Sequence, residues 1–95
     1  LDVWVETRKL ANLIYDATKV FPKEEIFGLV NQMRRCAVSV PSNIAEGSRR
    51  RSSKEKQNFF RIAFGSASEL ETQIEILKRL PFSKNIFTRG SIINN

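Results

Sequence analysis

Apolar residues recur at three- and four-residue steps through three successive stretches of the chain, and this spacing is the strongest constraint on the fold. In the first stretch the repeating residues are Val3, Leu10, Leu13, Ile14, Ala17, Val20 and Phe21. Such spacing is typical of the buried face of an amphipathic helix. No stretch alternates apolar and polar residues for long, and no Asn-Gly or Asp-Gly pair indicates a hairpin. The pattern therefore predicts an all-α protein.

Local signals place the helix boundaries. Gly47 suits the left-handed residue that commonly follows a helix, and Ser52 with Glu55 matches a capping box. Pro41 lies inside the second stretch, where its missing N–H and its ring bend a helix, so a kink is expected near residues 37–41. The three predicted helices span about residues 2–20, 22–46 and 53–80.

Three long amphipathic helices predict an antiparallel up-and-down bundle that forms a single domain over residues 1–95. Residues 63–68 are rich in Ala, Gly and Ser, so a neighbouring helix is expected to approach closely there. Beyond Pro81 the apolar pattern fades, and residues 81–95 leave room only for a short or truncated fourth helix. A chain of 95 residues buries a small core, which we expect a partner to complete.

The composition argues against most catalytic and metal-binding chemistry. The chain has no histidine, which is the commonest general base and a usual zinc ligand. The single cysteine, Cys36, has no partner for an internal disulfide, and we interpret it as a small buried hydrophobe. Neither a Walker motif nor a dinucleotide-binding fingerprint is present. We therefore predict no catalytic residue, metal or cofactor, and keep a small hydrolase or metal protein only as a third alternative.

The apolar runs are only a few residues long, whereas a membrane-spanning helix needs about 20. No signal sequence is visible at the start of the chain. The expectation is a cytoplasmic protein that does not enter a membrane.

Positive charge is concentrated in residues 31–60, which hold seven Lys and Arg against two acids. Clustered cations bind phosphates, and the arginine fork suits phosphate oxygens. An alternative interpretation is a solvated basic turn whose arginines pair with acids of another subunit. The candidate nucleic-acid-binding residues are Arg34, Arg35, Arg49, Arg50, Arg51 and Lys54.

Other polar and aromatic residues are interpreted as structural. Four polar residues are expected to make contacts between helices or subunits: Asn43, Glu46, Glu69 and Glu71. Phe60 and Phe64 lie four residues apart, so with Phe59 they are expected to widen the buried stripe of the third helix rather than stack on bases. Trp4 is expected to pack in a groove against another helix or subunit.

The residues also resemble a known family. The block Met-Arg-Arg-Cys-Ala-Val-Ser-Val-Pro-Ser-Asn-Ile-Ala-Glu-Gly at residues 33–47 is followed by Arg50, Ser52, Lys54 and Glu55. This block closely resembles the signature of the four-helix bundle proteins first noticed in intervening sequences of bacterial 23S ribosomal RNA genes. Residues 61–73 and the opening Val3-Trp4 fit the same family, and the resemblance covers about residues 1–80.

The resemblance implies an up-and-down four-helix bundle that assembles into a ring, commonly a pentamer, with no known enzymatic activity. The accessory variability protein of diversity-generating retroelements looks like the same fold. That likeness implies RNA or DNA and a reverse transcriptase as partners, bound through a basic surface.

Two hypotheses of different classes follow. The first is a non-enzymatic homo-oligomer that binds RNA or DNA through its basic residues. The second is a protein–protein assembly module that binds no nucleic acid.

Overall fold

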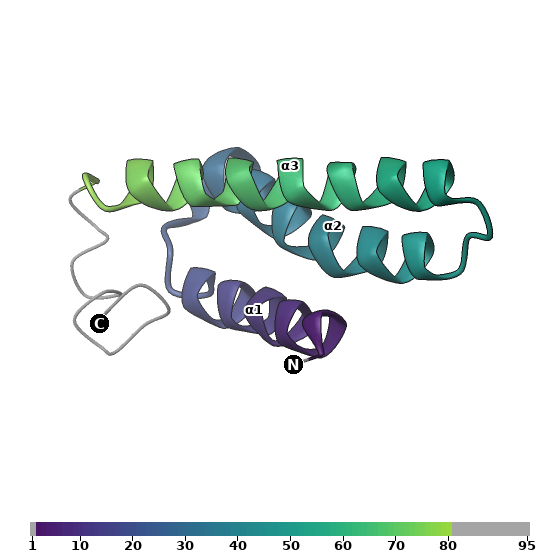
Figure 1. Cartoon of the computed structure of the whole chain (residues 1–95). Coiled ribbons are helices and arrows are strands. Elements are labelled where there is room, and N and C mark those ends of the chain that lie inside the picture. The colour runs from purple at the N-terminus through teal and green to yellow at the C-terminus, as the bar shows by residue number, and fades with distance from the viewer. Residues whose placement is uncertain (1, 81–95) are drawn as a thin grey trace.

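A computed structural model describes residues 2–80, and these residues are helical with short connections. Helix α1 covers Val3–Thr18, helix α2 covers Asn31–Ser48 and helix α3 covers Ser53–Leu77. Helices α1 and α3 both pack on α2 and make few contacts with each other (Figure 1). The prediction of an all-α fold is thus confirmed for residues 2–80. The predicted short fourth helix falls in residues 81–95, outside the described residues.

The second helix begins later than the sequence predicts. Instead of one helix from Pro22, the chain makes a 3-10 turn at Lys23–Glu25 and a π-helical turn at Ile26–Val30. The backbone leaves the helical region at Gly28, with φ −105° and ψ −111°, and regular α-helix starts at Asn31. Glycine lacks a Cβ and adopts such a conformation easily, so the break falls there.

One further expectation for α2 is wrong, and another stays a prediction. The chain continues as α-helix through Pro41, which is buried, and the bend expected near residues 37–41 stays a prediction. Gly47 lies inside the helix, which ends at Ser48 and is followed by a right-handed Arg49 (φ −88°, ψ −11°). Gly47 permits close packing of α2 on α3 and does not form a left-handed cap. A Cβ on Gly47 would lie 2.7 Å from Phe60 Cε1.

The start of α3 agrees with the sequence. The Ser52 Oγ accepts a hydrogen bond from the Glu55 N–H at 3.0 Å, which confirms the serine half of the predicted capping box. Helix α1 is capped in the same way, since Asp2 Oδ1 accepts from the Val5 N–H at 3.2 Å. Each cap satisfies a backbone donor that has no partner within its helix.

The core lies where α1, α2 and the C-terminal half of α3 meet. Ile14 and Val30 have no exposed surface, and Met33 is 1% exposed. Smaller and larger apolar side chains surround these three: Ala11, Phe21, Ala37, Leu70 and Leu77. All of these positions except Ala11 belong to the predicted stripes, whereas Leu13 of the first stripe is 49% exposed. The periodicity of the sequence therefore locates most of the core.

The predicted close approach at residues 63–68 is only partly right. Ala63 is buried, and the Ser66 hydroxyl donates to Ser39 Oγ of α2 at 2.7 Å. Gly65, however, faces open space, since a Cβ added to it would have no other atom within 4 Å.

The interpretation of the α3 phenylalanines as core residues is wrong for Phe60 and Phe64, whereas Phe59 is half-buried. Phe60 is 42% exposed and Phe64 is 75% exposed. Both lie at an apolar groove that runs between α1 and α3 and has α2 as its floor, because those two helices do not close over α2. The groove is lined by Val3, Thr7, Val40, Ile44, Ser48, Phe60, Ala63, Phe64 and Ala67.

Candidate nucleic-acid interface

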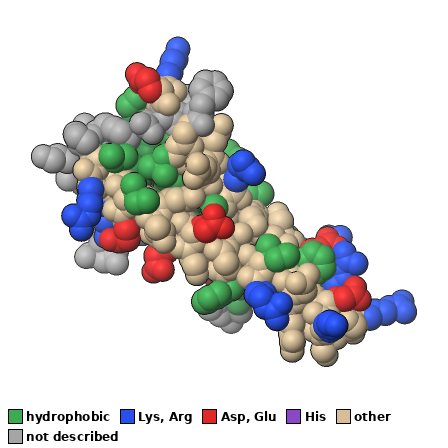
Figure 2. Space-filling model, turned by 90° about the horizontal axis from the view of Figure 1, so that it is seen from above, with side chains coloured by type: hydrophobic (Ala, Val, Ile, Leu, Met, Phe, Trp, Pro, Cys, Tyr) green, Lys and Arg blue, Asp and Glu red, His purple; other side chains and the backbone are tan. Residues whose placement is uncertain are grey.

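Three of the predicted phosphate-binding cations surround the turn between α2 and α3. Arg49, Arg51 and Lys54 are all exposed, and none makes a side-chain hydrogen bond or ion pair with another residue of the range 2–80. Figure 2 shows Lys and Arg side chains gathered at the end of the molecule that holds this turn. These three residues, named here the basic turn, are free to contact a polyanion.

Arg50 lies in the same turn but is already engaged. Its Nη2 contacts Glu46 Oε2 at 2.6 Å, and its Nη1 lies 3.9 Å from Glu55 Oε1. Its guanidinium also covers the Phe59 ring, 4.8 Å from the ring centroid. Arg50 therefore holds the end of α2 against the first turn of α3, and its ion pair with Glu46 joins the last turn of α2 to the turn that follows.

Arg34 likewise links two helices. Its Nε donates to Thr18 Oγ1 at 2.9 Å, and its guanidinium lies 4.7 Å from the centroid of the Tyr15 ring. Its Nη2 also donates to the Tyr15 carbonyl at 3.4 Å, in the last turn of α1. A cation near the C-terminal end of a helix complements the helix dipole. The side chain is half-buried, so its first role is structural.

Arg35 is exposed but lies elsewhere. Fourteen residues of α-helix separate it from Arg49, which corresponds to about 21 Å along the axis. It borders a polar groove between α2 and α3 that also contains Gln32, Cys36, Ser39, Ser66, Glu69 and Gln73. The six predicted cations therefore do not form one patch.

The Cys36 thiol in this polar groove is not activated. Its Sγ donates to Glu69 Oε2 at 3.8 Å and accepts from Gln73 Nε2 at 3.6 Å. Burial and the nearby Glu69 carboxylate raise the pKa of the Cys36 thiol, while the Gln73 hydrogen bond and the Arg35 charge oppose that shift only in part. The thiol is therefore protonated near neutral pH. It is half-buried and hydrogen-bonded to two polar side chains, rather than the buried small hydrophobe that the sequence predicts.

The other predicted polar contacts are arranged as follows. Asn43 Nδ2 donates to the Ser39 carbonyl at 2.8 Å and to Ser39 Oγ at 3.0 Å, and Ser39 in turn accepts from Ser66 of α3. Asn43 thus reaches α3 through Ser39. Glu71 is exposed. A role for Asn43, Glu46, Glu69 and Glu71 between subunits stays a prediction.

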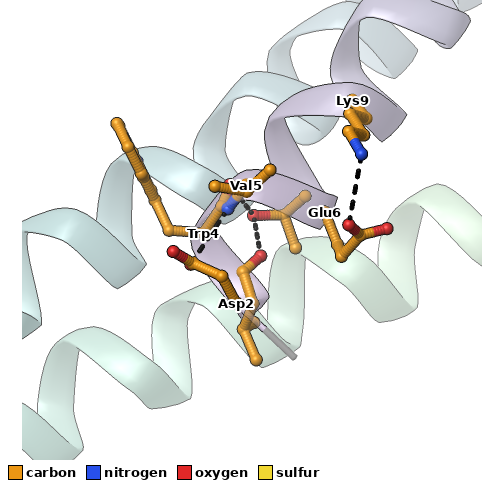
Figure 3. A network of polar contacts seen from close by, with 7 residues as sticks. Asp2, Trp4, Val5, Glu6 and Lys9 are labelled. Carbon is orange, nitrogen blue, oxygen red and sulfur yellow. Dashed lines mark hydrogen bonds and ion pairs between the residues drawn. The ribbon is translucent and has the colours of Figure 1, made fainter.

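A second groove, between α1 and α2, was not found from the sequence. It is lined by Trp4, Arg8, Ala11, Asn12, Val38, Pro41, Ser42, Ala45, Glu46 and Arg49. The Arg8 guanidinium lies over the Trp4 ring, 4.2 Å from the ring centroid. The ring extends from α1 on the side opposite to the Glu6–Lys9 pair (Figure 3). The four-residue spacing of Trp4 and Arg8 was a usable signal, but their position next to Arg49 depends on how the helices pack.

Within residues 2–80, no three Cys, Asp or Glu side chains come together in an arrangement able to hold a metal ion. None of the helices described is long and apolar enough to span a bilayer.

Comparison with known proteins gives one result for the family. The model of the 23S rRNA-intervening sequence protein family matches residues 1–88. No curated protein matches the chain.

Proposed function

Because the chain belongs to the 23S rRNA-intervening sequence protein family, we propose that it is a non-enzymatic, self-associating helical protein that binds RNA or DNA through its basic turn. The observation that carries this proposal is the contrast between neighbouring cations. Arg50 is held by two carboxylates, whereas Arg49, Arg51 and Lys54 remain exposed and have no such partner within residues 2–80. When unpaired cations of a protein contact phosphates, the counterions condensed on the nucleic acid are released. This release favours binding to a polyanion.

Contacts of this kind do not read a base sequence, because phosphates are the same at every position. The proposed protein therefore binds the nucleic-acid backbone rather than a particular base sequence. The family resemblance extends it to a ring, a pentamer, in the bacterial cytoplasm, with a reverse transcriptase as a further partner. Light scattering tests the ring, and co-purification with the reverse transcriptase tests the partner.

A second candidate function, an assembly module without nucleic-acid binding, is favoured by the apolar groove between α1 and α3. Phe64 is 75% exposed and Val3 is 52% exposed in that groove. Contiguous exposed apolar side chains favour burial against another protein surface. In this function a second copy of the chain covers the groove, and the arginines pair with its acids.

A binding assay at several salt concentrations separates the two functions. We expect a fluorescently labelled 20-nucleotide RNA to bind the protein, and the affinity to fall as salt rises, with a log–log slope of about −0.7 per phosphate contact on a single strand. Replacing Arg49, Arg51 and Lys54 together by alanine weakens binding and flattens this slope.

The matched control replaces three cations outside the basic turn, Lys9, Lys19 and Lys23, by alanine. It changes the net charge by the same amount and is expected to leave most of the affinity intact. Equal losses in the two triple variants, or no RNA binding by the native protein, would overturn the proposal and favour the assembly module.

A further inference from the structure

The groove between α1 and α2 opens next to the basic turn. Arg49 belongs to both, since it lines the groove and is the first residue after α2. The groove has a volume of about 560 Å³, which lies within the range of small-molecule sites of about 300–1,000 Å³. A nucleic-acid backbone that follows the basic turn therefore passes the mouth of a groove large enough for one nucleotide.

The groove offers an aromatic surface that is already oriented. Trp4 is 39% exposed, and the Arg8 guanidinium stacks over its ring at 4.2 Å. This cation–π contact limits the rotation of the indole and places a positive charge beside it. A planar indole next to a cation is the combination on which unpaired bases stack in single-strand binding proteins.

The charges around the groove favour an anion. Arg8 of α1 and Arg49, just after α2, both line it, and neither is paired with a carboxylate of the described residues 2–80. Glu46 also lines the groove, but Arg50 compensates its charge at 2.6 Å. Two cations and one neutralised acid leave the groove positive.

We propose that this groove binds an unpaired nucleotide, with the Trp4 indole stacking on the base and with Arg8 and Arg49 contacting its phosphates. The inference rests on the proposed function and narrows it to single-stranded segments. Bases in a duplex are stacked on one another and do not enter a groove between two helices, whereas unpaired bases are free to turn outward. The basic turn alone does not discriminate in this way, because both forms present phosphates.

The test uses Trp4 as its own probe, since the chain contains one tryptophan. The native protein is titrated at low salt with a 12-nucleotide single-stranded RNA and, separately, with a 12-base-pair RNA duplex. We expect the single strand to quench the Trp4 emission and the duplex to leave it nearly unchanged.

Affinities of the variants are then measured by anisotropy of labelled RNA. We expect Trp4→Ala to weaken single-strand binding about 10-fold and Trp4→Phe to restore much of the loss, because stacking needs an aromatic ring. Phe64→Ala is the matched control, since Phe64 is an exposed aromatic of the other groove. It is expected to leave RNA affinity unchanged. Circular dichroism checks that each variant is folded, and Trp4→Phe keeps the test valid if Trp4→Ala unfolds.

The outcomes distinguish this inference from the proposed function. Absence of binding to both RNAs overturns the proposed function and the inference together. Binding without a change in Trp4 emission, with Trp4→Ala as tight as the native protein, overturns the inference alone. If Trp4 emission instead follows protein concentration without RNA, and Trp4→Ala lowers the solution mass, the groove is an interface between copies and the inference is wrong.

Discussion

The Cα of Gly47 in α2 faces the Phe60 ring of α3 so closely that an added Cβ would lie 2.7 Å from Phe60 Cε1. The same Cβ would lie 3.1 Å from the Cβ of Phe59, an atom that side-chain rotation does not move. The two helices therefore approach each other closely just before the turn that carries the exposed cations.

We expect Gly47→Ala to lower the free energy of unfolding by about 1 kcal/mol. Alanine favours a helix by about 1 kcal/mol over glycine, but overpacking costs typically about 1–3 kcal/mol, so the clash outweighs the gain. Gly65→Ala is the matched control, because nothing lies within 4 Å of its added Cβ. That variant is expected to gain stability by up to about 1 kcal/mol. Urea unfolding measures both, and a stabilised Gly47→Ala variant would contradict the close approach.

The Ser52 cap gives a second prediction. Removing its hydroxyl leaves the Glu55 N–H without its acceptor at 3.0 Å, so Ser52→Ala should cost about 1 kcal/mol of stability. Ser53→Ala tests the neighbouring serine, which is the first residue of α3 and exposed. We expect Ser53→Ala to change the midpoint of urea unfolding little, and similar losses in both variants would argue against the cap.

The sequence predicts those parts of the fold that depend on local chemistry. The stripes that contain Ile14, Met33 and Leu70 follow the helical period, and the cap at Ser52 is visible from its spacing with Glu55. The path from Pro22 to Val30 was not predictable in this way, because its acids and apolar residues also fit a regular helix start. The break at Gly28 directly precedes Leu29 and Val30, which pack in the core.

The charge composition predicted which cations are candidates for phosphate binding, but not which of them are already held by other residues. Arg34 and Arg50 read like their neighbours in the sequence, yet Thr18 holds the first and Glu46 the second. Thr18 lies sixteen residues from Arg34, so only the packing of α1 on α2 reveals that bond. The exposure of Phe64 has the same origin, since its helical spacing is that of a core residue while α1 and α3 leave its side of α2 open.

The two kinds of arginine should separate in experiments. Arg34→Ala removes the bond to Thr18 Oγ1 and the contact with the Tyr15 ring, so we expect it to lower stability by about 1–2 kcal/mol with little effect on RNA affinity. Arg51→Ala is expected to do the opposite, because Arg51 is exposed and makes no ion pair within residues 2–80. Thermal unfolding and RNA anisotropy on both variants check this. A strong loss of RNA affinity in a fully folded Arg34→Ala variant would show that Arg34 contacts RNA, contrary to this prediction.

The Cys36 thiol supplies the last prediction, because its raised pKa links reactivity and stability to pH. The unfolded chain loses the thiol proton near the ordinary value of 9.0, while the folded protein holds it to higher pH. The unfolded state therefore binds fewer protons in this window, and the free energy of unfolding falls as pH rises above about 9. The Cys36→Ala variant lacks this contribution. The difference between its free energy of unfolding and that of the native protein, measured against pH, therefore isolates the contribution of the thiol.

Two substitutions in the polar groove should shift this pKa in opposite directions. Glu69→Gln removes a negative charge beside the sulfur, so it should lower the pKa of Cys36, whereas Gln73→Leu removes a donor to the thiolate and should raise it. The rate of iodoacetamide alkylation against pH measures both, since the thiolate is the reacting form. An unchanged pKa in both variants would show that burial alone sets the pKa, and that neither Glu69 nor Gln73 acts on the thiol through its charge or hydrogen bond.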